Sequence, residues 1–475
     1  MNLSKVFTAI AFTIASGTVL MAQSGPTPVL SLEQCIGIAL SKSPTIKVAD
    51  MEVTRVDYSR KETLGQLLPS ISFGATYNRT LAKQVMYMNM DGFGDMGNKD
   101  ESEPSSRAGS DSKSSGGGIK VGLDNSYNAG FSASMPLVAP QLWQSMKLAD
   151  SQILRSVEQA RSSRLELVNQ VKSAYYTLLL AEDSRRVINE SYEMAKLNFD
   201  IYTKKHEAGA ASDYDVLRTS VAMKNIEPEL MQSEIAIKQA RLQLLILMGL
   251  DADFSFTTES GLSAYEETMY ESALNQSRDY SRNPSLVLNQ IDSSIARRNV
   301  NIQKAAWFPT LALSANYNWT SMSNGSPLRN FRWTPYSTIG LTLSFPIFEG
   351  GQRYSRVKQA KLQAAELLVQ REDLRRNIDS QVTLAIDNIN VNIKQIASCS
   401  ESVKEAERAH DIMQRSFEIG AASYLDLRDS ELSLTRARLT RFQAIYNFLV
   451  AQSELELLLG NAPIESYSAA IDSLN

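Results

Sequence analysis

Cysteine and histidine are scarce in this chain, which has only two of each among its 475 residues. His206 and His410 occupy unmatched positions of the duplication described below, so a histidine metal site or a catalytic dyad is not expected. Cys35 and Cys399 lie in helical patterns, where small core residues are the main expectation and a disulfide is the minority alternative. Since nucleophile motifs and glycine-rich phosphate loops are also missing, the sequence predicts no enzyme, no cofactor and no metal site.

An excess of positive charge is missing as well. The chain has 48 Lys and Arg residues against 52 Asp and Glu residues, which gives a formal net charge of -4. This balance provides no attraction to a polyanion. We therefore expect no nucleic-acid partner.

Long apolar runs are confined to the amino terminus. Residues 1–22 combine Lys5, an apolar run and the small Ala22, a pattern typical of a secretory signal. No later stretch has the roughly eighteen uninterrupted apolar residues that a transmembrane helix needs. If the exported chain enters a bilayer, the sequence favours a closed β-barrel, in which every backbone group is paired.

The chain does contain one sequence unit written twice. Residues 68–78 match residues 308–318 at an offset of 240, and residues 130–136 match residues 340–346 at an offset of 210. The difference between these offsets indicates an insertion of about 30 residues in the first copy.

The four matched stretches alternate between apolar and small polar residues with period two, which predicts four strands with one polar face each. Aromatic residues cluster at the strand ends. Such clusters are typical of the interfacial girdle of a membrane barrel, although the strands of soluble proteins are also rich in aromatics. The candidate girdle residues are Tyr77, Tyr127, Tyr317, Trp319, Trp333 and Tyr336.

One loop separates the two strands of each copy. Residues 81–118 are rich in Gly, Ser, Asp and Met and predict a solvated loop, and the second loop, residues 321–330, is short. The methionines at 86, 88 and 90 are also suited to a soft metal, but the surrounding acids and glycines favour the plain loop.

A second repeated motif marks two hairpin tips, because residues 209–215 return almost unchanged as residues 420–426 between helical patterns. A glycine with positive φ is expected to end each incoming helix, and a serine with an acid three residues later to cap the outgoing one. The tip residues are Gly209, Ala210, Ala211 and Ser212 in the first copy and Gly420, Ala421, Ala422 and Ser423 in the second.

The rest of the sequence is helical in pattern. Residues 139–208 and 349–419 predict two helices of about 70 residues, ~105 Å long at 1.5 Å per residue, which implies coiled-coil packing. Shorter helices are expected on either side of these, so that each repeat has one long helix beside two shorter helices that together match its length. The shorter helices lie at residues 31–66, 212–250, 267–306 and 423–459, with glycine stop signals at Gly249 and Gly460.

These elements divide the chain into a signal peptide, a first repeat, an equatorial linker, a second repeat and an equatorial tail, at residues 1–22, 23–250, 251–266, 267–460 and 461–475. Four strands cannot close a wide barrel, so several protomers must share one sheet. Cyclic symmetry favours three protomers and twelve strands. The predicted fold class is an α+β membrane protein, a trimeric β-barrel continued by a long α-helical coiled-coil barrel.

Together with the duplication, several motifs make the whole mature chain resemble the TolC family of outer-membrane efflux channels. These motifs are LSLEQ at residues 30–34, the proline-led strands, FPIFEGG at 345–351, the Gly-Ala-Ala-Ser tips, and the helix ends at 247–249 and 458–460. The resemblance implies a homotrimer with its barrel in the lipid of a Gram-negative outer membrane and a helical tunnel in the periplasm. It also implies a closed end at the helix tips, where a periplasmic adaptor docks and links the tunnel to an inner-membrane pump.

By motif position, the resemblance places gate residues at Tyr214, Asp215, Phe417, Asp426 and Asp429. Asp215 and Asp426 are also explained by helix capping alone. Asp429 lies one turn beyond Asp426, a position that capping does not require. The sequence departs from the family pattern at Ala422, where a basic residue would hold the gate shut through an ion pair.

The sequence therefore favours an outer-membrane export duct. A type I protein-secretion outlet of the same architecture is an alternative, and a soluble coiled-coil scaffold is a less favoured one. The family resemblance leaves the substrate open, because the pump and the adaptor select it in such systems.

Overall fold

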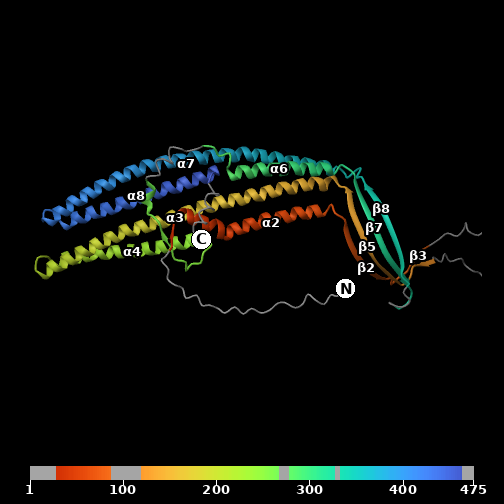
Figure 1. The fold of residues 1–475 in the computed structure, drawn as a ribbon, viewed down its shortest axis with the longest axis horizontal. Helices are drawn as coiled ribbons and strands as arrows, with labels where there is room; N and C mark the ends of the chain where they lie inside the picture. The colour runs from red at the N-terminus through yellow and green to blue at the C-terminus, as the bar shows by residue number, and fades with distance from the viewer. Residues whose placement is uncertain (1–27, 87–118, 267–277, 327–331, 463–475) are drawn as a thin grey trace, which may run out of the picture. The chain divides into compact units, whose positions relative to one another are not determined.

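The computed structural model describes residues 28–86, 119–266, 278–326 and 332–462 (Figure 1). The expected signal peptide, most of the 81–118 loop and residues 463–475 of the tail lie outside the described residues. The chain forms two compact units, which we describe separately. Unit 1 comprises Met1–Met51, Glu158–Val287 and Glu372–Asn475, and unit 2 comprises Glu52–Val157 and Leu288–Arg371.

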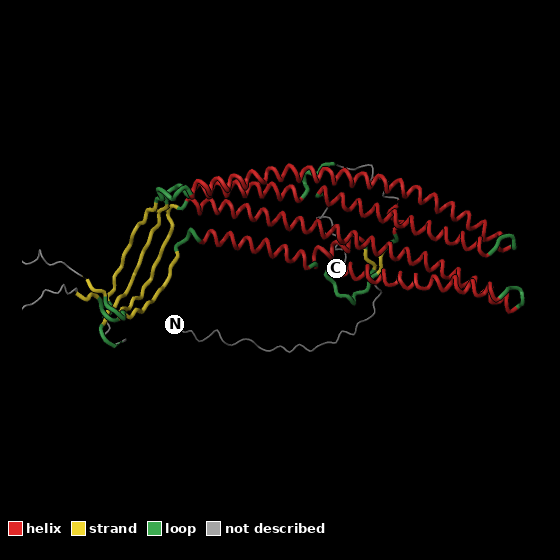
Figure 2. The backbone as a smooth tube through the Cα atoms, turned by 180° about the vertical axis from the view of Figure 1, so that it is seen from behind, coloured by secondary structure: helices red, strands yellow, loops and turns green. Residues whose placement is uncertain are grey.

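Unit 2 contains a four-stranded antiparallel sheet (Figure 2). The prediction of four strands is confirmed, and Gly130 permits close approach of two of them, because a Cβ there would collide with the side chain of Asn318. The strands follow one another across the sheet in the order β2 (Ser70–Arg79), β5 (Asn125–Val138), β7 (Thr310–Ser323) and β8 (Thr334–Ser344).

The register gives this sheet one apolar face and one polar face. Phe73 lies opposite Phe131, which in turn lies opposite Tyr317, and the adjacent Ser72 lies opposite Ser132 on the other face. The hydroxyls of Ser72 and Ser132 are 2.8 Å apart and hydrogen bonded. The polar face is therefore a surface of hydroxyl and amide groups.

The loop prediction for residues 81–118 is wrong at Gln84–Met86. This segment is β3, which pairs with β4 (Ile119–Val121) as a short antiparallel ribbon. The ribbon forms because its base is held together: Thr80 N donates to Asp124 O at 2.8 Å, and Lys83 Nζ lies 3.1 Å from the Asp124 carboxylate. The second loop also begins later than expected, since β7 extends to Ser323.

Helix boundaries follow the prolines more closely than expected. The single helix predicted at residues 31–66 is two helices, α1 (Leu32–Lys42) and α2 (Pro44–Gly65), because Pro44 has no N–H to continue the first. Of the helix predicted at 267–306, the structure has α6 (Pro284–Ala305); residues 278–283 are not helical, and residues 267–277 lie outside the described residues. Asn283 caps α6, since its Oδ1 accepts from the backbone N–H of Ser285 at 3.0 Å.

Two helical hairpins make up most of unit 1. The first consists of α3 (Pro140–Glu207) and α4 (Asp213–Met248), and the second of α7 (Gln352–Glu418) and α8 (Tyr424–Leu459). To unit 1, α3 contributes from Glu158 onward and α7 from Glu372 onward. Lys172 Nζ on α3 lies 2.5 Å from Glu456 Oε2 on α8, so these two helices are neighbours. Both views show the order α4, α3, α8, α7, with α4 and α7 outermost (Figures 1 and 2).

One face of α3 in unit 1 is covered by residues 251–266, which we call the belt segment. Within it, β6 (Thr257–Thr258) pairs in parallel with β1 (Val29–Leu30), and a turn of 3-10 helix, η1 (Leu262–Tyr265), follows. The buried Asp183 accepts from the backbone N–H of Leu262 at 2.8 Å, and Glu182 accepts from the Thr258 hydroxyl at 2.7 Å. These bonds attach the belt segment to α3.

Candidate functional site at the helix tips

The two hairpin tips have the backbone that the repeated motif predicts. Gly209 and Gly420 have φ of 71° and 77°, a conformation that favours glycine. Ala210 N donates to Lys205 O at 2.7 Å, which satisfies a carbonyl at the end of α3, and Ala421 N does the same for Ser416 O at 2.8 Å. Both tips are therefore closed turns of small residues.

The acids that follow the tips act as caps. Asp215 Oδ2 accepts from the Ser212 hydroxyl at 2.7 Å, and Asp426 Oδ2 accepts from the Ser423 hydroxyl at the same distance. Hydrogen bonds from the serine side chain and backbone lower the pKa of both carboxyl groups. Asp429 is exposed on α8, one turn beyond Asp426. Capping thus accounts for Asp215 and Asp426 but not for Asp429.

The aromatic residues assigned to the gate are not brought together. Tyr214 is 68% exposed on α4, whereas Phe417 is half-buried on α7 with Lys205 Nζ 5.7 Å from its ring centre. The same ammonium group lies 5.2 Å from the Tyr202 ring, so it joins two rings on different hairpins.

A contact between the two hairpins was missed by the sequence reasoning. Tyr424 on α8 is only 4% exposed, its ring centre is 5.4 Å from that of Tyr202 on α3, and the Arg218 guanidinium on α4 is 4.9 Å from its centre. Burial raises the pKa of the Tyr424 hydroxyl. We call Tyr202, Lys205, Arg218, Phe417 and Tyr424 the tip cluster. The available signal was that Tyr424 stands where the first tip has Asp213.

The hairpins also meet further from the tips. Asn198 Nδ2 on α3 donates to Glu431 Oε1 on α8 at 3.4 Å. Burial raises the pKa of the Glu431 carboxyl, an effect that the Asn198 hydrogen bond and Arg428 only partly oppose.

The predicted girdle residues fall into two groups in unit 2. Tyr77 stacks on Tyr127 with ring centres 4.8 Å apart, and Tyr317 lies edge-on to Trp319 at 4.7 Å, all on the apolar face. Tyr336 pairs with Asn318 on the polar face, so its place among them is wrong. Trp333 precedes the first residue of β8.

A second group of exposed aromatic residues was missed. It lies where the sheet strands of unit 2 join helices, a position that is apolar and exposed in both repeats. Arg353 is 5% exposed and lies 4.9 Å from the ring centre of one member, Trp307. The group consists of Trp143, Trp307, Phe308, Phe345 and Phe348.

The described residues contain no group of three or more His, Cys, Asp or Glu side chains suited to a metal ion. Cys35 and Cys399 are free thiols, and burial raises the pKa of Cys35 to about 12. Within the part of the chain that the structure describes, no helix is long and apolar enough to cross a membrane.

Comparison with known sequences finds relatives among bacterial export proteins. The chain is 29% identical over 187 residues to outer membrane protein TolC of Escherichia coli, which covers 38% of each chain. It is 25% identical over 350 residues to outer membrane protein TolC of Vibrio cholerae, which covers 70% of this chain and 76% of that protein. A cobalt-zinc-cadmium resistance protein, CzcC, of Cupriavidus metallidurans is 22% identical over 60% of this chain and 66% of its own.

Solved structures show the same fold. The CmeC outer membrane channel of Campylobacter jejuni superposes with a TM-score of 0.70 at 17% identity, covering 93% of this chain and 88% of that one. The outer membrane protein VceC of Vibrio cholerae gives a TM-score of 0.65 at 14% identity, covering 90% of this chain and 96% of that one.

The family model for outer membrane efflux proteins matches residues 35–250 and 277–461, which overlap the two predicted repeats. This match confirms the family resemblance and the outer-membrane location that it implies. The chain belongs to the outer membrane efflux protein family.

Proposed function

We propose that three copies of this chain form an export duct through the outer membrane, closed at the hairpin tips and opened when a periplasmic adaptor and an inner-membrane pump engage it. The observation that carries the proposal is that both units have two different unpaired edges. Different edges that match each other join copies head to tail, and such contacts close into a ring.

The edges of unit 2 are strands. In the described sheet, β2 and β8 each pair on one side only. A strand edge with free N–H and C=O groups is not tolerated in lipid, so β8 of one copy is expected to pair with β2 of the next. The apolar face then contacts lipid, and the hydroxyl-rich face lines the barrel.

The edges of unit 1 are helices. α4 exposes an apolar stripe, and α7 exposes Leu384, Val391 and Ile412, which are 58–64% exposed and separated by multiples of seven residues. Heptad spacing is typical of a coiled-coil seam, and exposed apolar patches of this kind mark interfaces. The stripe on α4 comprises Leu217, Val221, Met231, Ile235 and Ile246, which are 56–68% exposed.

The tip cluster supports a gate that needs no basic residue at Ala422. Arg218, Tyr202 and Tyr424 link α4, α3 and α8, and they hold the second hairpin against the first in the closed duct. Asp426 and Asp429 of three copies would then surround the narrowest point. Carboxylates that crowd one axis attract cations and repel one another.

The tips also suit adaptor docking. Gly209, Ala210, Gly420 and Ala421 are exposed and small, so a partner helix can approach their backbone closely. Gly420→Val should abolish export but leave membrane insertion intact, because a β-branched residue at φ 77° distorts the tip. Gly325, also at positive φ but in the β7–β8 loop, offers a matched Gly→Val control that should still export.

Membrane fractionation and planar-bilayer recording test the proposal together. The protein should require detergent for extraction and should then give discrete conductance steps in a bilayer. A protein that stays soluble, as the scaffold alternative requires, or that inserts without conductance, would overturn the duct.

A further inference from the structure

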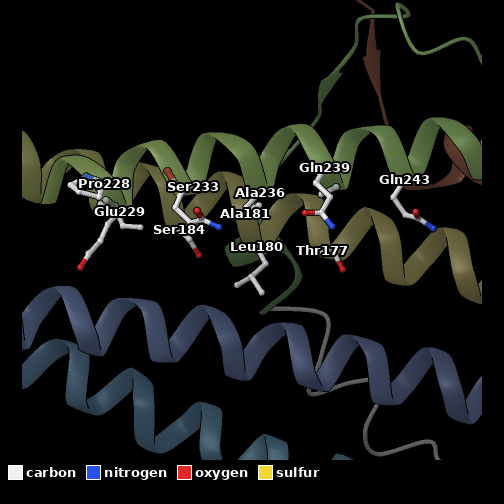
Figure 3. A pocket seen from close by; sticks show the side chains of 13 residues that line it. Thr177, Leu180, Ala181, Ser184, Pro228, Glu229, Ser233, Ala236, Gln239 and Gln243 are labelled. Carbon is white, nitrogen blue, oxygen red and sulfur yellow. The ribbon is translucent and has the colours of Figure 1, made fainter.

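A groove runs along the first hairpin of unit 1, between α3 and α4 (Figure 3). Its volume is about 980 Å³, at the upper end of the range for small-molecule sites. The labelled side chains of both helices lie along one side of the hairpin (Figure 3). The apolar lining comes from Leu180, Ala181 and Ile188 of α3 and from Pro228, Ala236 and Ala240 of α4.

The polar groups of the groove favour a positively charged ligand. Glu229 is the one charged residue among the described residues that line it, and three glutamines of α4 provide amide groups beside the apolar floor. The described lining residues include no Lys or Arg, and Arg185 of α3 binds Glu234 at 2.9 Å. The carboxylate of Glu229 is thus a negative end on an otherwise neutral groove.

Pro228 lines the groove beside Glu229. It lies inside α4 and has no N–H, so the Lys224 carbonyl one turn earlier lacks the helix hydrogen bond that any other residue at 228 would donate. Lys224 is not among the residues that line the groove, so the Glu229 carboxylate is the acceptor that suits an ammonium or iminium group.

The groove faces away from the belt segment. Leu180 and Ser184 line the groove, whereas Glu182, two residues from each, binds the belt segment at Thr258. Helix positions two residues apart point to different sides. In the proposed duct the belt segment must lie outside, since three copies of it on the inner wall would block the passage. The groove then lines the interior.

We propose that this groove is a binding site for small organic cations with an apolar body, on the inner wall of the duct. The inference rests on the proposed function for its place inside the duct. The apolar floor takes up the body of the ligand, and the Glu229 carboxylate takes up its charge.

The test uses rhodamine 6G, a fluorescent organic cation, and the full-length protein in lipid nanodiscs, where no detergent competes for the groove. Fluorescence anisotropy should show saturable binding. Glu229→Gln should weaken it about fivefold, the effect of one partly exposed charge contact. Ala236→Trp fills the groove and should weaken it at least tenfold. Glu227→Gln, on the same helix but outside the lining, should bind like the unaltered protein.

A neutral dye, Nile red, separates the charge from the apolar floor: its binding should fall in Ala236→Trp but not in Glu229→Gln. The site is refuted if rhodamine 6G shows no saturable binding, or if Glu229→Gln and Glu227→Gln bind it equally. Planar-bilayer conductance of the same purified protein distinguishes the failure of the cation site from the failure of the duct. A protein that conducts but does not bind the dye refutes the cation site alone. A protein that does not conduct refutes the duct.

Discussion

The tip cluster predicts that Tyr424 controls how often the duct opens. Tyr424→Leu keeps an apolar side chain of similar reach but removes the ring that Tyr202 and Arg218 contact at 5.4 and 4.9 Å. An aromatic pair contributes about 0.5–1.5 kcal/mol and a cation–π contact about 0.5–1 kcal/mol. The closed state should therefore lose about 1–2.5 kcal/mol, which raises the open-to-closed ratio about 5- to 60-fold.

Planar-bilayer recordings measure that ratio directly as the time spent in the high-conductance state. Tyr424→Phe is the matched control, because it keeps the ring and loses only a hydroxyl, and it should gate like the unaltered channel. Arg218→Gln should also raise the open-to-closed ratio, but by less than Tyr424→Leu does. If Tyr424→Leu opens no more often than Tyr424→Phe, the tip cluster does not hold the hairpins closed, and the gate is held elsewhere.

Three further predictions concern glycines and acidic residues of unit 1. A Cβ on Gly249 would lie 2.8 Å from the Lys42 carbonyl oxygen, whereas the space around Gly209 is open to 4 Å in the described structure. Both glycines have positive φ, so Gly209→Ala should lower the free energy of unfolding by about 1 kcal/mol, and Gly249→Ala should lower it by about 1–3 kcal/mol more. Circular dichroism should show this as a larger fall in melting temperature for Gly249→Ala. Equal falls in melting temperature would contradict the close approach at Gly249. Asp426→Ala combined with Asp429→Ala should weaken cation selectivity and block by multivalent cations, and unchanged recordings would identify these acids as caps or surface charges. Because burial raises the pKa of Glu431, burial of this carboxyl between the hairpins is most favourable when it is protonated, and it becomes less favourable as the pH rises from the ordinary pKa through the raised one. Opening should accordingly increase with pH above 4.5, the ordinary value, and Glu431→Gln should remove this dependence, whereas the same pH profile in both proteins would refute it.

The sequence predicts most of the fold because its signals are local and occur twice. Period-two alternation identified the four strands, and the Gly-Ala-Ala-Ser motif identified both tips. Errors arose where an available local signal was not used. The Asn283-Pro284 pair is a helix start. Likewise, Tyr336 has the opposite parity to Ile339 and Leu341, which places it on the polar face.

The candidate site could be predicted only in part. Helix capping by Asp215 and Asp426 follows from spacing along one segment, and the structure has both bonds. The tip cluster joins residues of four helices from two hairpins, and no spacing within one helix reveals how two hairpins pack. The only sequence signal at Tyr424 was its difference from Asp213, the residue at the matching position of the first repeat.

Native mass spectrometry of the protein extracted in mild detergent tests the central claim most directly. The free strand edges of unit 2 and the exposed helix edges of unit 1 require neighbouring copies, so the intact particle should have the mass of three chains. Ile235→Asp on the exposed edge of α4 should shift that mass toward the monomer, because it places a charge in the contact. A monomeric mass for the unaltered protein, with its helical circular dichroism intact, would contradict the duct.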